Sequence, residues 1–251
     1  MGRAFAILAL LLVLAGCEAK ATPLPVALEP TTTPSPTAQV ISVRYGLSPE
    51  AYAFWSAEMP AGAAQFDPRV ESATAFDVAV AFGSFPNMSP APAAIVVKLR
   101  LNTSLAPLDD PEIARLVIQA FDPALAAQAV ADLGATPPVS TEGGPDPSAI
   151  RSALANAGYP DGLPLLIGAH APGADRLVRM AQPYGIDLRL QEVADDATAS
   201  GARHGEIMGR PAWSEEQSTG FLELYQVPIS VYHRSDLALH FTETGLPNAG
   251  T

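Results

Sequence analysis

The chain has 251 residues and a formal net charge of −12, from 14 Lys and Arg residues against 26 Asp and Glu residues. This acidity excludes nucleic-acid binding as the expected role, because nucleic-acid-binding proteins use Lys and Arg to neutralise phosphates. The single cysteine excludes a disulfide framework and a zinc–thiolate site, so stability has to come from a hydrophobic core.

The first predicted segment is a secretory leader at 1–16, which ends before Cys17. Arg3 precedes an apolar stretch from Ala4 to Ala15, which is shorter than the ~20 residues that a membrane-spanning helix needs. The string Leu14-Ala15-Gly16-Cys17 resembles the bacterial lipobox. That resemblance implies cleavage before Cys17 and lipidation of its thiol, palmitate included. An ordinary signal or anchor helix that contains a cysteine is the alternative.

A stalk is predicted at 17–39, where Ala, Thr and Pro predominate and no apolar periodicity occurs. Such a segment is extended and semi-rigid, and it cannot bury a core. Together with the leader, it predicts an exported protein that is anchored to the cell membrane by lipid and faces the extracytoplasmic side.

The folded body is predicted to begin near Val40, with a small N-terminal α/β lobe at 40–96. The β-branched run at 40–45 predicts a strand, and Ser48-Pro49 predicts the start of a helix, with Ser48 as its cap. Further strands are expected at 75–82 and 94–101, on either side of a loop at 83–88.

Three Asp-Pro pairs predict three helix starts, at Asp110, Asp122 and Asp146. Aspartate at the cap accepts hydrogen bonds from free backbone N–H groups, and proline is tolerated at the first helical position. Gly134 and Gly158 stand where the second and third of these helices are expected to end.

An alternation of strands and helices follows the turn at 159–162. We expect a strand at 163–169, a helix at 174–184 that ends at Gly185, and strands at 186–191, 205–208 and 221–232. Strands separated by helices favour parallel sheets with crossover helices. Residues 236–251 are expected to form a C-terminal tail.

Two strings carry a resemblance to a known family. Asn102-Thr103-Ser104 precedes Pro107-Leu108-Asp109-Asp110-Pro111 and a helix; later, a helix ends at Gly158 and Tyr159-Pro160-Asp161-Gly162 leads into a strand. Together they resemble the C-terminal lobe of the extracellular solute-binding proteins of family 5, the peptide-, oligopeptide- and nickel-binding components of ABC importers. The resemblance covers roughly residues 96–234, although members of the family are usually about twice as long.

The resemblance implies an α/β fold with the type II, two-lobe architecture of periplasmic binding proteins, reduced in size. The second lobe would occupy 97–235, and chain crossings near 97–103 and 217–227 would form the hinge. Ligands of such proteins bind between the lobes, near strand ends and helix N-termini.

The implied function is that of a lipid-anchored solute-binding protein, which delivers a small, peptide-like solute to the membrane subunits of an ABC importer. We expect a monomer that performs no chemistry and needs no cofactor or metal. One alternative is an accessory or interaction lipoprotein that kept the fold and lost the ligand. A secreted enzyme is another, but the sequence carries no H-E-x-x-H, G-x-S-x-G, P-loop or G-x-G-x-x-G motif.

Metal chemistry finds little support in the histidines, which are scattered without ligand-like spacing at positions 170, 204, 233 and 240. His204-Gly205-Glu206 matches the H-x-E of zinc deaminases, but those enzymes also need a P-C-x-x-C partner that this chain lacks.

Five residues are candidates for ligand binding, and they rest on position along the chain. Ser84 and Phe85 lie in a loop after a predicted strand, and an ordinary surface turn is the alternative. Trp213 can stack on a ligand if it is exposed, whereas Tyr45 precedes Gly46 at a predicted strand end; core packing is the alternative for both. Asn102 belongs to the string that carries the family resemblance.

Overall fold

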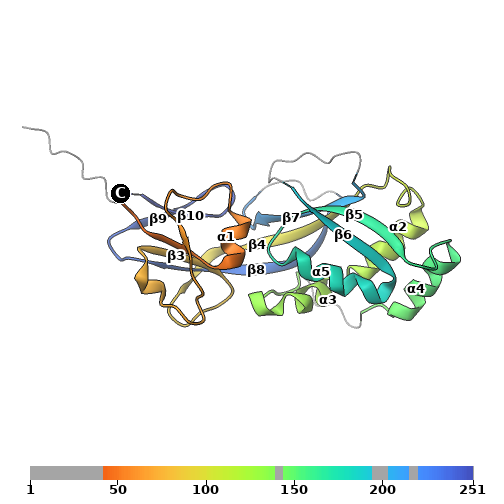
Figure 1. The fold of residues 1–251 in the computed structure, drawn as a ribbon, viewed down its shortest axis with the longest axis horizontal. Helices are drawn as coiled ribbons and strands as arrows, with labels where there is room; N and C mark the ends of the chain where they lie inside the picture. Colours follow the sequence, from red (N-terminus) through yellow and green to blue (C-terminus); the bar gives the residue numbers. More distant parts are fainter. Residues whose placement is uncertain (1–41, 139–143, 194–202, 215–219, 251) are drawn as a thin grey trace, which may run out of the picture. The chain divides into compact units, whose positions relative to one another are not determined.

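The computed structural model describes residues 42–138, 144–193, 203–214 and 220–250 (Figure 1). The predicted leader, Cys17 and the predicted stalk therefore lie outside the described residues. Across the described ranges, no helix has the length and apolar character that crossing a bilayer demands.

Secondary structure covers most of the described chain. Its first part contains β1 (Tyr45–Leu47), α1 (Pro49–Phe54), β2 (Ala64–Gln65), the 3-10 helix η1 (Ala73–Ala75), β3 (Val78–Phe82) and β4 (Ser89–Leu101). Its middle part contains α2 (Pro111–Ala120), α3 (Pro123–Ala129), the 3-10 helix η2 (Ala131–Leu133), α4 (Pro147–Asn156), β5 (Leu163–His170), α5 (Ala174–Ala181), the 3-10 helix η3 (Gln182–Tyr184) and β6 (Ile186–Glu192). Its last part contains β7 (Gly205–Pro211), β8 (Leu222–His233), β9 (Ala238–Phe241) and β10 (Pro247–Gly250).

Eight of these strands form one sheet, in the order β2-β1-β3-β8-β4-β7-β5-β6. The first three strands are parallel to one another, and so are the last three. The long strands β4 and β8 run antiparallel to each other and to their outer neighbours. The α/β class is therefore confirmed. The expected parallel pairing occurs in two groups of strands, which the antiparallel pair β4–β8 joins.

The strands β4 and β8 connect the two ends of the sheet, in the part of the chain where the sequence predicts crossings. Residues 229–233 of β8 pair with β3, and residues 95–101 of β4 pair with β7. The expected lobe boundary between residues 96 and 97 falls inside β4, so backbone hydrogen bonds continue across it. Two lobes joined by these strands remain a prediction.

The helix starts follow the predicted capping chemistry. Asp122 Oδ1 accepts hydrogen bonds from the N–H groups of Ala124 and Leu125, at 2.9 and 3.1 Å. Asp110 and Asp146 each cap their helix in the same way. In α1, the Oγ atom of Ser48 accepts from the N–H of Ala51 at 3.3 Å. These caps satisfy donors that a helix cannot satisfy by itself.

Of the strand predicted at 40–45, residues 40 and 41 lie outside the described residues, and β1 begins at Tyr45. Tyr45, Gly46 and Leu47 are all buried and pair with β3, whereas 42–44 carry no strand. Gly46 is required here, because a Cβ atom at this position would lie 2.5 Å from the ring of Phe76. Burial on the sheet, more than β-branched composition, therefore fixes the start of the strand.

Residues 236–250 do not form a tail but a hairpin, in which β9 and β10 are antiparallel. Leu237 and Leu246 are buried in the core. The hydroxyl of Tyr45 donates to Asn248 Oδ1 at 3.1 Å and accepts from the N–H of Ala249 at 2.8 Å. The hairpin is thus fastened to β1 by a buried tyrosine, a long-range contact that the local sequence pattern does not reveal.

Asp77 joins three segments of the sheet, and its ionisation should make stability depend on pH. Its carboxylate accepts from the N–H of Arg44 at 2.9 Å and from Arg234 Nη1 at 2.8 Å. The hydrogen bond from Arg44 and the charge of Arg234 lower the pKa of Asp77. Because the folded-state pKa is depressed, its stabilisation is complete above about pH 3.9 and is lost as the pH falls through the folded-state value.

We therefore expect Asp77→Asn to destabilise the protein at neutral pH, and the difference from wild type to shrink at acid pH. Denaturant unfolding of both proteins at several pH values measures this difference. Asp187→Asn is the control, because Asp187 is exposed and pairs with Arg189 on the surface. A wild-type advantage that stays constant with pH would contradict the assignment.

Candidate functional site

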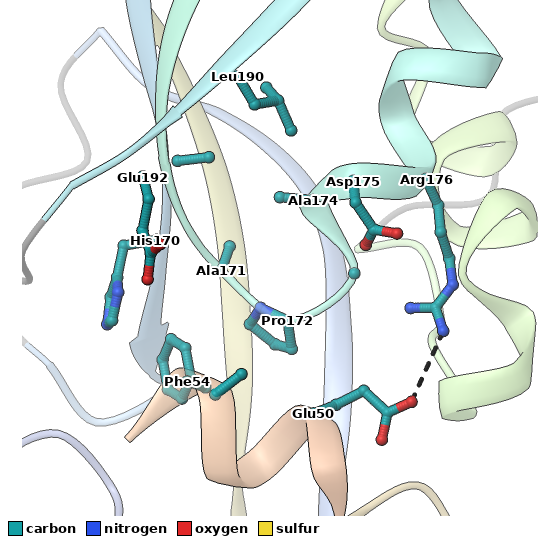
Figure 2. Close-up of a pocket in the computed structure, with 13 residues that line it drawn as sticks. Glu50, Phe54, His170, Ala171, Pro172, Ala174, Asp175, Arg176, Leu190 and Glu192 are labelled. Carbon is teal, nitrogen blue, oxygen red and sulfur yellow. Dashed lines mark ion pairs between the residues drawn. The ribbon is translucent and has the colours of Figure 1, made fainter. Parts of the chain in front are cut away.

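A pocket of about 490 Å³ lies between α1 and the carboxyl end of β5 (Figure 2). In sheets with parallel strands, ligands characteristically bind at the carboxyl ends of the strands. The lining comes from α1, the end of β5, the loop that follows it, the first turn of α5 and the end of β6. The lining residues are Glu50, Ala53, Phe54, Ala169, His170, Ala171, Pro172, Gly173, Ala174, Asp175, Arg176, Leu190 and Glu192.

The loop between β5 and α5 forms one wall of the pocket, and its backbone is held from behind. Gly173 has φ +78°, and a Cβ atom there would lie 2.6 Å from the side chain of Val130. Both the backbone conformation and the lack of space therefore require glycine at this position. The buried hydroxyl of Tyr225, on β8, donates to the carbonyl of Pro172 at 2.9 Å. Burial raises the pKa of Tyr225, so the donor stays protonated.

An aromatic pair forms the opposite side of the pocket. The rings of Phe54 and His170 are stacked, with centroids 4.8 Å apart and planes at 25°. Behind Phe54, the rings of Trp55 and Phe82 make edge and tilted contacts and extend into the core. The pair thus joins α1 to the end of β5 through a rigid aromatic cluster.

Arg176 is the arginine that lines the pocket, and it is held by two acids. Its guanidinium lies 2.7 Å from Asp132 and 3.8 Å from Glu50. Figure 2 shows the contact with Glu50 reaching from α5 to α1. The Arg176–Glu50 ion pair therefore connects α5 with α1, and the Phe54–His170 stack connects β5 with α1.

His170 is the titratable group of the aromatic pair. Burial, and then the charge of Arg210, lower its pKa, against opposing effects of Glu192 and Glu58. The ring is consequently neutral at neutral pH. Among the residues that the structure describes, no three His, Cys, Asp or Glu side chains are placed to hold a metal ion.

The five predicted ligand residues are not among those that line this pocket. Tyr45 is 4% exposed and fastens the C-terminal hairpin, as the core alternative predicts. Ser84 is exposed in the loop after β3. Phe85 lines a smaller pocket of about 70 Å³, which shares Glu50 with the larger one.

Asn102 and Trp213 lie elsewhere. The side chain of Asn102 donates to the carbonyl of Arg203 at 3.2 Å and accepts from the N–H of Ser104, so it stabilises the chain turn after β4. Trp213, 42% exposed, makes an edge contact with Phe241 at 5.9 Å. It follows β7, and its exposure leaves a surface for stacking.

The two side chains of the H-x-E string, His204 and Glu206, make contacts that join neighbouring segments of the sheet. His204 Nδ1 accepts from the N–H of Leu166 at 2.8 Å, and Nε2 faces the carbonyl of Ala106 at 3.2 Å. Glu206 is buried and pairs with Arg100 at 2.7 Å. Both side chains serve the packing of the sheet.

Sequence analysis missed Phe54, His170 and the loop between β5 and α5 as pocket residues. The available signal was Ala171-Pro172-Gly173, a break between a predicted strand and a predicted helix. A loop of this kind marks the carboxyl end of a strand, where ligands bind.

Comparisons with solved structures place this chain beside solute-binding proteins. One is an ABC transporter substrate-binding protein from Sinorhizobium meliloti, at 16% identity and a TM-score of 0.44, with 80% of this chain and 59% of that chain covered. A second is the murein tripeptide binding protein MppA of Escherichia coli, at 14% identity and a TM-score of 0.47, with coverages of 65% and 50%. A third is NikZ from Campylobacter jejuni in complex with Ni(L-His), at 12% identity and a TM-score of 0.45, with coverages of 72% and 57%.

The chain spans between 50% and 59% of the length of these three proteins. At such identities and TM-scores, the similarity says nothing about the solute. No protein-family model matches the sequence, and a search of curated proteins finds no match.

Proposed function

We propose that this chain is an extracytoplasmic solute-binding protein, which captures a small solute in the pocket between α1 and the β5–α5 loop. The observation that carries the proposal is the pocket itself. Its volume of about 490 Å³ falls within the range typical of ligand sites, and its wall combines apolar side chains with a few charged groups. The protein acts by binding, without chemistry.

Two features outside the pocket support a role at a membrane. The string at Cys17 resembles a lipobox, and the Ala/Thr/Pro-rich stretch after it suits a spacer that holds a binding domain away from the bilayer. We propose that the chain is lipid-anchored through Cys17 and passes its solute to the membrane subunits of an ABC importer.

Two contacts across the pocket hold its walls together. The Phe54–His170 stack and the Glu50–Arg176 pair both connect α1 with the β5–α5 segment. The stacked rings contribute about 0.5–1.5 kcal/mol beyond their buried area, and the ion pair is long, at 3.8 Å.

Thermal unfolding of the intact chain with a panel of short peptides, amino acids, sugars, polyamines and divalent metals tests the proposal. A solute at about 100 times its Kd adds about 2.7 kcal/mol to the free energy of unfolding, which raises Tm by several degrees in a domain of this size.

Ala53→Trp should abolish that shift, because Ala53 is exposed on α1 and its side chain lines the pocket. A tryptophan at this position would fill the pocket without disturbing the core. Ala57→Trp is the matched control, since Ala57 is also exposed but does not line the pocket. If no solute shifts Tm, the role of an accessory lipoprotein without a ligand replaces this one.

A further inference from the structure

The side chains that line the pocket carry more negative than positive charge, and we assign the excess negative charge to Glu192. Three carboxylates line the pocket, on Glu50, Asp175 and Glu192. Glu50 and Asp175 lie in the first turns of α1 and α5, where they offset the positive ends of the helix dipoles. Glu50 also contacts Arg176.

Glu192 lies at the end of β6, away from the first turn of any helix that the structure describes. It is exposed there, and its charge raises the pKa of the neighbouring His170, although burial and the charge of Arg210 lower that pKa. Figure 2 shows Glu192 and His170 side by side at one end of the pocket. Arg210, on β7, contributes positive charge near His170 but is not part of the lining. A carboxylate at the edge of an apolar pocket attracts a cation.

The rest of the lining suits the apolar body of a solute. Ala171 and Pro172 lie beside the aromatic pair, and Leu190, Ala53 and Ala174 add further apolar groups to the lining. Burial of an apolar group against such a surface contributes about 25 cal/mol for each Å² removed from water.

The cationic side chain that lines the pocket is already paired with acids, so it is not available to the carboxylate of a solute. Arg176 is the lining cation, and it already contacts Asp132 at 2.7 Å and Glu50 at 3.8 Å. A solute carboxylate would have to displace these acids and would also meet the charge of Glu192. The charge of Glu192 therefore disfavours a solute carboxylate at its end of the pocket.

We propose that the pocket takes a monocationic amine with an apolar body, its ammonium beside Glu192 and its body against Pro172 and Leu190. This inference rests on the proposed function and narrows it, because it excludes free amino acids and other solutes with a carboxylate at this site.

Four compounds with the same phenyl ring test the charge requirement by calorimetric titration of the intact chain. They are phenethylammonium, 2-phenylethanol, phenylalanine and 3-phenylpropionate, which are cationic, neutral, zwitterionic and anionic. We expect phenethylammonium to bind at least about tenfold more tightly than the other three, because a charge-assisted hydrogen bond forms only with the ammonium.

Glu192→Gln should weaken phenethylammonium binding about tenfold, and Glu243→Gln should leave it unchanged. Both glutamates are exposed, but Glu243 lies in the β9–β10 hairpin and does not line the pocket. The inference would be overturned if the neutral or the anionic compound bound as tightly as phenethylammonium. It would also be overturned if Glu192→Gln left the affinity for phenethylammonium unchanged.

The outcomes also separate this inference from the proposed function. If another solute of the panel binds, loses its binding in Ala53→Trp and keeps it in Glu192→Gln, the pocket is a solute site without a requirement for cations. If neither these four compounds nor any member of the panel binds, the inference and the proposed function both fail.

Discussion

Trp55→Ala should lower the free energy of unfolding by about 4 kcal/mol, because removal of a fully buried tryptophan typically costs about 3–5 kcal/mol. Trp55 is 2% exposed and packs against Phe54 at 5.3 Å and Phe82 at 5.1 Å between ring centroids. Its Nε1–H also donates to the carbonyl of Thr244 at 3.1 Å, which connects α1 with the C-terminal hairpin.

The matched control for Trp55 is Trp213→Ala, which removes the same side chain from an exposed position. Trp213 is 42% exposed, so its loss should cost less than about 1 kcal/mol. Urea unfolding of the wild type and both variants measures the difference. If the two substitutions cost the same, the segment around α1 is not part of the common core, and one wall of the pocket has no rigid support.

Cys17→Ala should abolish lipid attachment completely, because the sulfur atom of Cys17 would carry the lipid and the chain has no other cysteine. Metabolic labelling with an alkynyl palmitate analogue measures this directly. The mass of the mature N-terminus would show whether cleavage occurs before Cys17. Buried acyl chains contribute about 0.8 kcal/mol per CH₂ group to membrane binding, so their loss should also weaken anchoring.

Thr22→Ala is the control for Cys17→Ala, since it alters the predicted stalk and leaves Cys17 intact. It should be labelled as the wild type is. A wild-type protein that stays unlabelled yet remains in the membrane fraction would favour the alternative, an uncleaved apolar anchor at the N-terminus.

The local structure of this chain could be predicted from its sequence because the signals are themselves local. Asp122-Pro123 caps and starts a helix through atoms that lie within three residues of each other. Gly185, with φ +78°, ends its helical segment where predicted, since glycine adopts this conformation without strain.

The pairing of distant segments could not be predicted in this way. The antiparallel β4–β8 pair joins residues more than 120 positions apart, and no local pattern encodes the partner. Tyr45 was a candidate for ligand binding, but its hydroxyl bonds to Asn248, which was expected in a tail. The pocket brings α1 together with β5 and β6, so its members become recognisable only after the sheet order is known.

The most direct test of the account is to locate a bound solute by NMR of alanine methyl groups. Ala53, Ala171 and Ala174 line the pocket, whereas Ala114 and Ala120 are buried in α2, outside its lining. For a solute that raises Tm, the account predicts saturable shift changes at the three pocket alanines and none at the two in α2. Saturable changes that leave all three pocket methyl groups unaffected would contradict it.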